Sequence, residues 1–193
     1  MRLALVLVVA GCATDAPLAD EDYDRVALSL GSSLGGEQAL LADVAAIARG
    51  GSLVREGTSY RVICHTDGAE VACGPHATTA RARVSTADRL ELPAFAIATE
   101  RGAELELSLA PARIDGTLTS RYASTTDATS FTLDYTAQLA GVTLDAPGGR
   151  VDYAIELDDR PIAGTLELAD LATLALDARH YTIELATGRV SGP

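Results

Sequence analysis

The spacing of apolar residues divides this chain into two parts. Between residues 20 and 49 apolar side chains recur every three or four positions, which is typical of amphipathic helices. Two such runs stand on either side of Gly35-Gly36, a pair that predicts a break, and Gly50-Gly51 predicts the end of the second run. The pattern therefore predicts a helical hairpin over residues 20–51. Its apolar stripes are formed by Tyr23, Val26, Ala27, Leu30 and Leu34, and by Leu40, Leu41, Val44, Ala45 and Ala48.

From residue 52 the period changes to two. The segments 104–109, 131–139, 151–158 and 182–185 alternate apolar with polar residues, as antiparallel strands do when one face is buried and the other is wet. About ten strands are expected, joined by turns without helical crossovers. The fold class is therefore α+β: an N-terminal helical hairpin packed on a large antiparallel β-domain over 52–193, arranged as a meander, a sandwich or a half-barrel. Residues 20–193 are expected to form one globular domain.

Many outward-facing positions of these predicted strands are acidic residues. The chain has 27 acidic and 15 basic residues, a net charge of −12, which argues against nucleic acid as a partner because phosphate binding needs clustered cations. An acidic sheet face serves solubility, binds divalent cations or meets a basic partner, and the sequence favours the first. The acidic positions are Glu91, Glu104, Glu106, Asp115, Asp134, Asp152, Glu156, Asp158, Glu167 and Glu184.

The start of the chain has the order of an export signal. Met1-Arg2 precedes an apolar run over 3–10 that is too short to span a bilayer, and small residues follow it. The stretch Val9-Ala10-Gly11-Cys12 resembles the lipobox of bacterial lipoproteins. The resemblance implies cleavage after Gly11 and acylation of Cys12, with residues 1–11 as signal peptide and 12–19 as lipidated cysteine and tether. Two or more acyl chains give stable anchoring.

The same resemblance implies a location. Ala13 stands where aspartate commonly marks retention in the inner membrane of Gram-negative lipoproteins. We therefore expect a cell-envelope protein held through Cys12, in the outer membrane where the cell has one. The alternative is that the apolar run is a buried first strand.

The two remaining cysteines, Cys64 and Cys73, form an even pair in an exported chain. A hairpin with a four-residue loop over 67–70 places them opposite each other, at a spacing that a disulfide can bridge. The alternative is a metal site that adds His65 and His76. Its spacing is irregular, and neighbouring residues of a strand point to opposite faces, so the disulfide is favoured and no metal ligands are assigned.

No catalytic or cofactor motif emerges from the sequence. The three histidines, His65, His76 and His180, form no zinc-protease pattern, and no Gly-x-Ser-x-Gly elbow is present. Residues 31–36, GSSLGG, lack the lysine of a phosphate loop. No catalytic residue and no cofactor are therefore assigned, and the protein is expected not to be an enzyme.

The leading expectation is a non-catalytic structural or interaction module on the envelope, with an unknown protein partner. The first alternative is a carrier of an apolar or acyl ligand inside the β-domain, because its inner face is mainly aliphatic. The second is an unrecognised hydrolase. An aliphatic cavity of several hundred Å3 would favour the carrier. A cleft joining His180 or His76 to a serine and a carboxylate would favour the hydrolase.

Overall fold

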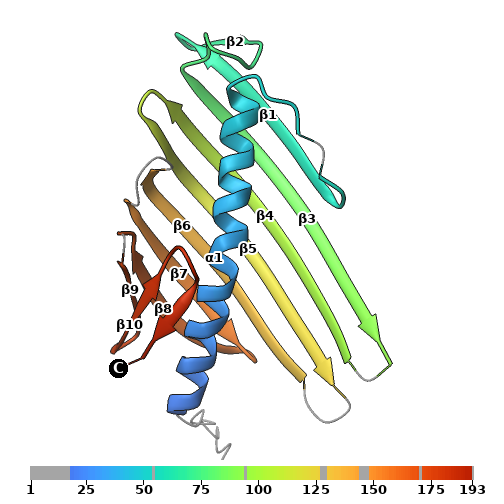
Figure 1. The fold of residues 1–193 in the computed structure, drawn as a ribbon, viewed down its shortest axis with the longest axis vertical. Coiled ribbons are helices and arrows are strands. Elements are labelled where there is room, and N and C mark those ends of the chain that lie inside the picture. Colours follow the sequence, from blue (N-terminus) through green and yellow to red (C-terminus); the bar gives the residue numbers. More distant parts are fainter. Residues whose placement is uncertain are drawn as a thin grey trace, which may run out of the picture.

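The computed structural model describes residues 18–53, 55–93, 95–126, 130–143, 148–169 and 171–192. Within these residues one long helix lies across one face of an eleven-stranded antiparallel sheet (Figure 1). The large antiparallel sheet predicted from the alternating segments is confirmed. The lipobox, including Cys12, lies outside the described residues.

The sheet is a meander over most of its width. Its strand order is β11-β10-β9-β8-β7-β6-β5-β4-β3-β1-β2, so only the step from β2 to β3 passes over a neighbouring strand. The strands are β1 (Thr58–Thr66), β2 (Ala69–Val71), β3 (Thr79–Leu92), β4 (Phe95–Leu109), β5 (Ala112–Thr126), β6 (Ser130–Thr143), β7 (Arg150–Leu157), β8 (Arg160–Glu167), β9 (Leu171–Leu176), β10 (Arg179–Glu184) and β11 (Arg189–Ser191).

Register keeps the apolar positions of neighbouring strands on the helix side of the sheet. In β6 and β7, for example, Tyr135 is paired with Ile155 and Leu133 with Leu157, and all four side chains are buried. Burying an aliphatic side chain of this size contributes about 1.5–3 kcal/mol. A slip of one residue would turn each of these side chains to the wet face, so the alternation itself fixes the pairing.

The helical region is a single helix, α1 (Asp20–Ala48), and the predicted hairpin is wrong. The helix runs through Gly35-Gly36 without a break. Glycine in a helix interior costs about 1 kcal/mol relative to alanine, but burial outweighs that cost because the apolar positions stay in phase across the pair. Leu30, Leu34 and Leu41 follow one another at helical spacing and are all buried.

The helix contacts strands toward both edges of the sheet, namely β1 on one side and β9, β10 and β11 on the other. The helix comes close to the turn between β10 and β11 at Gly31, where an added Cβ would lie 2.5 Å from Val190 Cγ2 and 2.9 Å from the Gly188 carbonyl oxygen. Only glycine lets the helix come this close to the turn between β10 and β11. The helix and the sheet share one apolar core.

The disulfide between Cys64 and Cys73 is confirmed, with a Cα–Cα distance of 5.2 Å. The predicted hairpin register is wrong, because Cys64 is paired with Val71 and the turn has only two residues, Asp67 and Gly68. Both turn residues have positive φ, +51° and +79°, as a type I′ turn requires. Cys73 therefore lies beyond the end of β2.

The disulfide holds a short segment against the end of α1. The Gly74 amide donates a hydrogen bond to the Ala48 carbonyl oxygen at 3.1 Å, which satisfies one of the carbonyls that a helix C-terminus leaves unpaired. The sulfur of Cys64 is buried and lies 3.7 Å from the same oxygen. The cross-link thus joins β1 to the segment that caps the helix.

The wet face of the sheet carries charges of both signs. Arginines lie directly opposite acids on neighbouring strands, which offsets the repulsion that a purely acidic face would create. These exposed cross-strand ion pairs are Arg81–Glu106, Arg83–Glu104, Arg121–Asp134 and Arg150–Glu167.

Candidate functional site

Two hollows lie between α1 and the sheet, one on each flank of the helix. One is lined by helix residues Leu34, Glu37, Gln38, Leu41 and Ala42, and has a volume of about 450 Å3. The other is lined by helix residues Arg25, Ser29, Ser32 and Ser33, and has a volume of about 580 Å3. We call the first the aliphatic cavity and the second the arginine groove.

The aliphatic cavity faces β5, β6 and β7 and the turn after β10. Its walls are hydrocarbon apart from a few polar groups, and its sheet side is made of side chains that the alternating pattern directs inward. These walls include Leu118, Ala137, Leu139, Val142, Val151, Leu168 and Leu185. A hollow of this size and lining falls within the range of small-molecule sites in proteins.

A buried carboxyl group lies at the edge of this cavity. Glu37 is 7% exposed, and its Oε1 accepts hydrogen bonds from the Tyr135 hydroxyl and from Ser33 Oγ, the latter at 3.2 Å. Ser33 and Tyr135 line the arginine groove, whereas Glu37 lines the aliphatic cavity. The hydrogen-bonded cluster of Glu37, Tyr135 and Ser33 therefore connects the walls of the two hollows beneath the helix.

Burial raises the pKa of the Glu37 carboxyl above its usual range. The hydrogen bonds from Tyr135 and Ser33, together with the guanidinium of Arg101, offset the pKa shift only in part. Burial and the neighbouring Glu37 also raise the pKa of Tyr135. The cluster is thus biased toward its neutral form, which suits an apolar cavity.

A tyrosine on the wall of the aliphatic cavity has a hydroxyl group without a hydrogen-bond partner in the described part of the chain. Tyr153 is 5% exposed, and its hydroxyl oxygen has no hydrogen-bond partner among the described residues. Its ring packs edge-to-face against Tyr135 with the centroids 5.7 Å apart. An unpaired buried hydroxyl costs about 1–3 kcal/mol, and a polar atom of a ligand in the cavity would remove that cost.

The arginine groove has a different character. Arg25 and Arg101 line it and form no ion pair with any described acid, whereas eight other arginines do. The guanidinium carbon of Arg25 lies 5.3 Å from the centroid of the Phe131 ring, and Arg101 Nε is buried without a hydrogen-bond partner in the described chain. Hydroxyl side chains supply much of the remaining lining: Ser29, Ser32, Ser33, Thr99, Ser120, Tyr122, Ser124, Ser130 and Tyr135.

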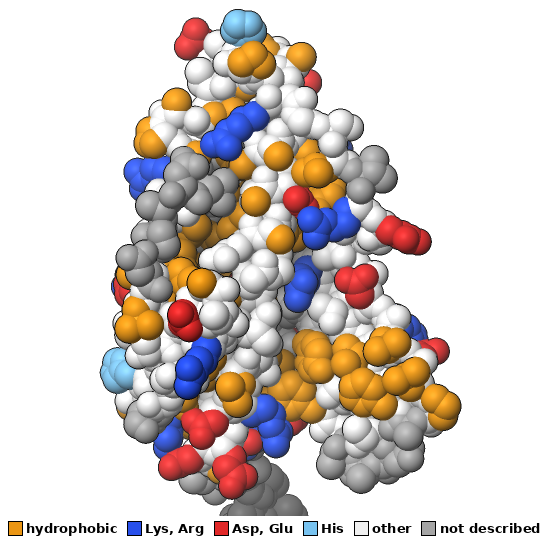
Figure 2. Space-filling view, viewed as in Figure 1, with side chains coloured by type: hydrophobic (Ala, Val, Ile, Leu, Met, Phe, Trp, Pro, Cys, Tyr) orange, Lys and Arg blue, Asp and Glu red, His pale blue; other side chains and the backbone are white. Residues whose placement is uncertain are grey.

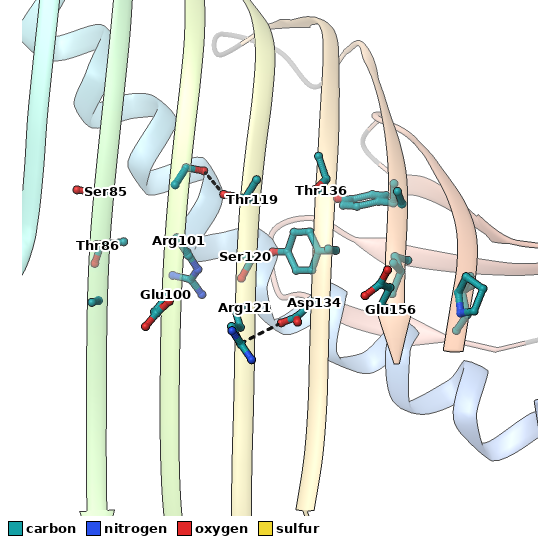
Figure 3. A pocket seen from close by; sticks show the side chains of 18 of the residues that line it. Ser85, Thr86, Glu100, Arg101, Thr119, Ser120, Arg121, Asp134, Thr136 and Glu156 are labelled. Atoms are coloured by element: carbon teal, nitrogen blue, oxygen red, sulfur yellow. Dashed lines mark hydrogen bonds and ion pairs between the residues drawn. The ribbon is translucent and has the colours of Figure 1, made fainter. Parts of the chain in front are cut away.

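The opposite face of the sheet has a broad depression of about 1190 Å3 (Figure 3). Small side chains that lie opposite one another in register form its floor, and exposed charges border it, including Glu100, Arg121 and Glu156. Arg121 is already paired with Asp134, with Nε and Oδ1 3.7 Å apart. The floor residues are Ser59, Ser85, Gly102, Thr119, Thr136, Ala154 and Ala163.

The structure places the cysteines and histidines away from both hollows. Cys64 and Cys73 are joined to each other, so their sulfurs are not free to act as thiolate ligands with His65 and His76. In the described part of the chain, neither His76 nor His180 has a side-chain hydrogen bond to a serine or a carboxylate, and neither lines a hollow beside the helix. The arrangement that would favour a hydrolase is not found in these residues.

Glu37, Tyr135, Tyr153 and Arg101 are not among the functional residues predicted from the sequence. One signal was available, because Glu37 falls on the apolar stripe between Leu34 and Leu41, where a charged residue needs a partner. The inward positions of the tyrosines also follow from the alternation. The cavity itself depends on how far the helix stands from the sheet, which no pattern in the sequence specifies.

Comparison with known protein families, with curated proteins and with solved structures gave no match. Within the described residues, no helix combines the length and the apolar character that a membrane crossing requires.

Proposed function

We propose that this protein is a lipid-anchored envelope protein that carries an apolar ligand between α1 and the sheet. The observation that supports the proposal is the aliphatic cavity, which has a volume of about 450 Å3. A cavity of several hundred Å3 with aliphatic walls favours a carrier, whereas a filled core would favour a structural module. An acyl chain or a similar hydrocarbon is the class of ligand that fits such walls, because burying apolar surface is its main source of affinity.

The polar groups of the cavity favour a ligand with one hydrogen-bonding end. Tyr153 offers an unpaired hydroxyl group, and Glu37 is biased toward the neutral carboxyl, so neither presents a fixed charge to the hydrocarbon. A few polar groups in a mainly apolar site commonly fix the orientation of a ligand.

Anchoring through Cys12 would keep this domain close to the membrane. Seven residues, 13–19, separate Cys12 from the start of α1, and seven extended residues reach at most about 25 Å. The test of this part is the intact mass of the protein from its own host. We expect a chain that begins at acylated Cys12, whereas a chain that retains residues 1–11 without acylation would contradict it.

A substitution at the cavity rim tests the carrier function. Ala42 is an exposed α1 residue that lines the aliphatic cavity, so Ala42→Phe should fill the entrance at little cost to the fold. We expect it to weaken binding of the fluorescent fatty acid cis-parinaric acid at least tenfold. The titration uses the full chain carrying Cys12→Ser, so that no covalent acyl group competes for the cavity.

Ala39→Phe provides the matched control, because Ala39 is on the same helix and lines neither hollow. It should bind the probe as the parent chain does. Equal binding by the Ala42→Phe and Ala39→Phe chains, or no binding by the parent, would contradict the carrier proposal and restore the structural module as the leading interpretation.

A further inference from the structure

The arginine groove lies on the other flank of α1 from the aliphatic cavity, and it opens toward a part of the sheet that the helix leaves uncovered. The ends of β3 to β6 extend beyond the helix, and a continuous apolar surface is visible there (Figure 2). Leu90 and Leu92 are 50% and 55% exposed. They are paired in register with Ile97 and Phe95, which are half-buried.

This apolar surface is continuous with the groove through the strand register. Ile97 is paired with Ser124, and Ser124 with Phe131. Both Ser124 and Phe131 line the arginine groove. A molecule with a polar head in the groove would therefore have its hydrocarbon beside Ile97 and the two exposed leucines.

The charges in the groove define the sign of such a head. In a chain with a net charge of −12, Arg25 and Arg101 stand out because they line the groove and neither forms an ion pair with a described acid. The acids nearest Arg25 in sequence are used elsewhere: Asp22 pairs with Arg160, and Asp24 accepts a hydrogen bond from Tyr181. Asp22 and Asp24 therefore face β8 and β10, whereas the Arg25 side chain lines the groove.

Further donors are available beside the two guanidinium groups. The hydroxyl groups of Tyr122, Ser124 and Ser130 line the groove and form no hydrogen bond with another described side chain. At Gly36 an added Cβ would lie 3.2 Å from Arg101 Nη1, so the glycine leaves room for the guanidinium against the helix. Guanidinium and hydroxyl groups together are the donors that bind phosphate oxygens in proteins.

We infer that the arginine groove binds the phosphate head of an anionic phospholipid, with the hydrocarbon lying on the uncovered apolar surface of β3 and β4. The uncovered ends of β3 to β6 lie at the same end of the molecule as the start of α1 (Figure 1). A lipid anchor on Cys12 would place this end toward a bilayer. The inference does not depend on occupation of the aliphatic cavity.

The test compares two lysophospholipids with the same palmitoyl chain, one with the anionic glycerol head and one with the zwitterionic choline head. Native mass spectrometry of the full chain measures binding of each below its micellar concentration. We expect the anionic lipid to bind at least tenfold more tightly. Arg101→Gln and Arg25→Gln should each lower that preference several-fold, and the double variant should abolish it.

Arg61→Gln serves as the matched control, because Arg61 is exposed on the wet face of β1 and forms no ion pair with a described residue. Thermal unfolding of every variant establishes that the fold is retained, and the exposed position of Arg25 makes its variant informative even where Arg101→Gln unfolds. Equal binding of the two lipids, or a preference that both arginine variants retain, would overturn the inference.

A third ligand separates a lipid from a free anion. Glycerol 3-phosphate has the phosphate without the hydrocarbon, and we expect it to bind at least a hundredfold more weakly than the anionic lysophospholipid. Binding of equal strength would show that the apolar surface contributes nothing and would overturn the lipid assignment. Leu92→Ser should weaken the lysophospholipid without changing the binding of glycerol 3-phosphate.

Discussion

At the scale of single residues, Glu37 combines an acidic side chain with deep burial. It lies on the buried stripe of α1, between the aliphatic cavity and the hydroxyl groups of Tyr135 and Ser33. A charged carboxylate in such a place would lose much of its hydration. Neutralisation of the carboxyl lowers that cost, and the raised pKa is the measurable consequence.

The raised pKa of Glu37 predicts a pH dependence of stability. The folded state retains the Glu37 proton above the pH at which the unfolded chain releases it. The contribution of the protonated carboxyl to stability is therefore complete below about pH 4 and is lost as pH rises through the pKa of the folded state. Relative to Glu37→Gln, the wild type should lose about 1.4 kcal/mol of unfolding free energy per unit by which the pKa is raised. Chemical denaturation between pH 4 and pH 8 measures the difference.

Glu156→Gln on the exposed face controls for the loss of one negative charge. Its unfolding free energy should follow that of the wild type across the same range. Curves for wild type and Glu37→Gln that stay parallel from pH 4 to pH 8 would show that the Glu37 carboxyl has the same pKa in the folded and unfolded chains, which would contradict an apolar cavity edge.

Residue-scale features were only partly predictable. The pairing of Cys64 with Cys73 follows from their proximity in the sequence and from the export that the lipobox resemblance predicts, and the disulfide is confirmed. The turn that joins their strands was misread, because Asp67-Gly68 forms a two-residue turn in which both residues have positive φ. Tyr135 and Arg101, which act on Glu37, lie on β6 and β4, far from it in the sequence, so no local pattern could have identified them.

At the scale of elements, α1 shows how packing overrides a local signal. The strands were predictable because a period of two is hard to produce in any other way. The helical hairpin was wrong because a glycine pair weakens a helix without ending it when the apolar stripe continues on both sides. Turn residues and periodicity disagreed at Gly35-Gly36, and periodicity was the better guide.

Two identical substitutions in α1 should have opposite effects. A Cβ added at Gly35 meets nothing within 4 Å, so Gly35→Ala should raise the unfolding free energy by about 0.5–1 kcal/mol. A Cβ added at Gly31 would collide with Val190 and the Gly188 backbone, so Gly31→Ala should lower it by about 1–3 kcal/mol. Urea denaturation of both variants tests the continuous helix, since a hairpin turn at Gly35 would make its alanine variant destabilising.

Loss of the disulfide should act on one end of the same helix. Replacing Cys64 and Cys73 with serine should lower the unfolding free energy by about 2–3 kcal/mol, the value expected for so short a closed loop. Because Gly74 donates to the Ala48 carbonyl, hydrogen exchange should accelerate at the Gly74 amide and the end of α1. The amides of β7 and β8 serve as the internal reference, and acceleration there of equal size would contradict a local role for the cross-link.

At the scale of the whole molecule, one helix cannot cover one face of an eleven-stranded sheet. It contacts strands toward both edges but leaves a cavity on one flank, a groove on the other and an uncovered surface at the ends of β3 to β6. The number of strands and the existence of an aliphatic inner face were predictable from the sequence. The amount of that face left open was not, because it depends on the length and direction of α1.

The central claim is that the hollow beside α1 holds an apolar ligand in the protein's own environment. Native mass spectrometry of the wild-type protein, extracted from the membranes of its host in mild detergent, tests it most directly. The account predicts a chain acylated at Cys12 together with a second hydrocarbon-containing molecule that dissociates on collisional activation, and the second molecule should be depleted in Ala42→Phe. A spectrum containing only the covalently modified chain, in wild type as in Ala42→Phe, would contradict the account.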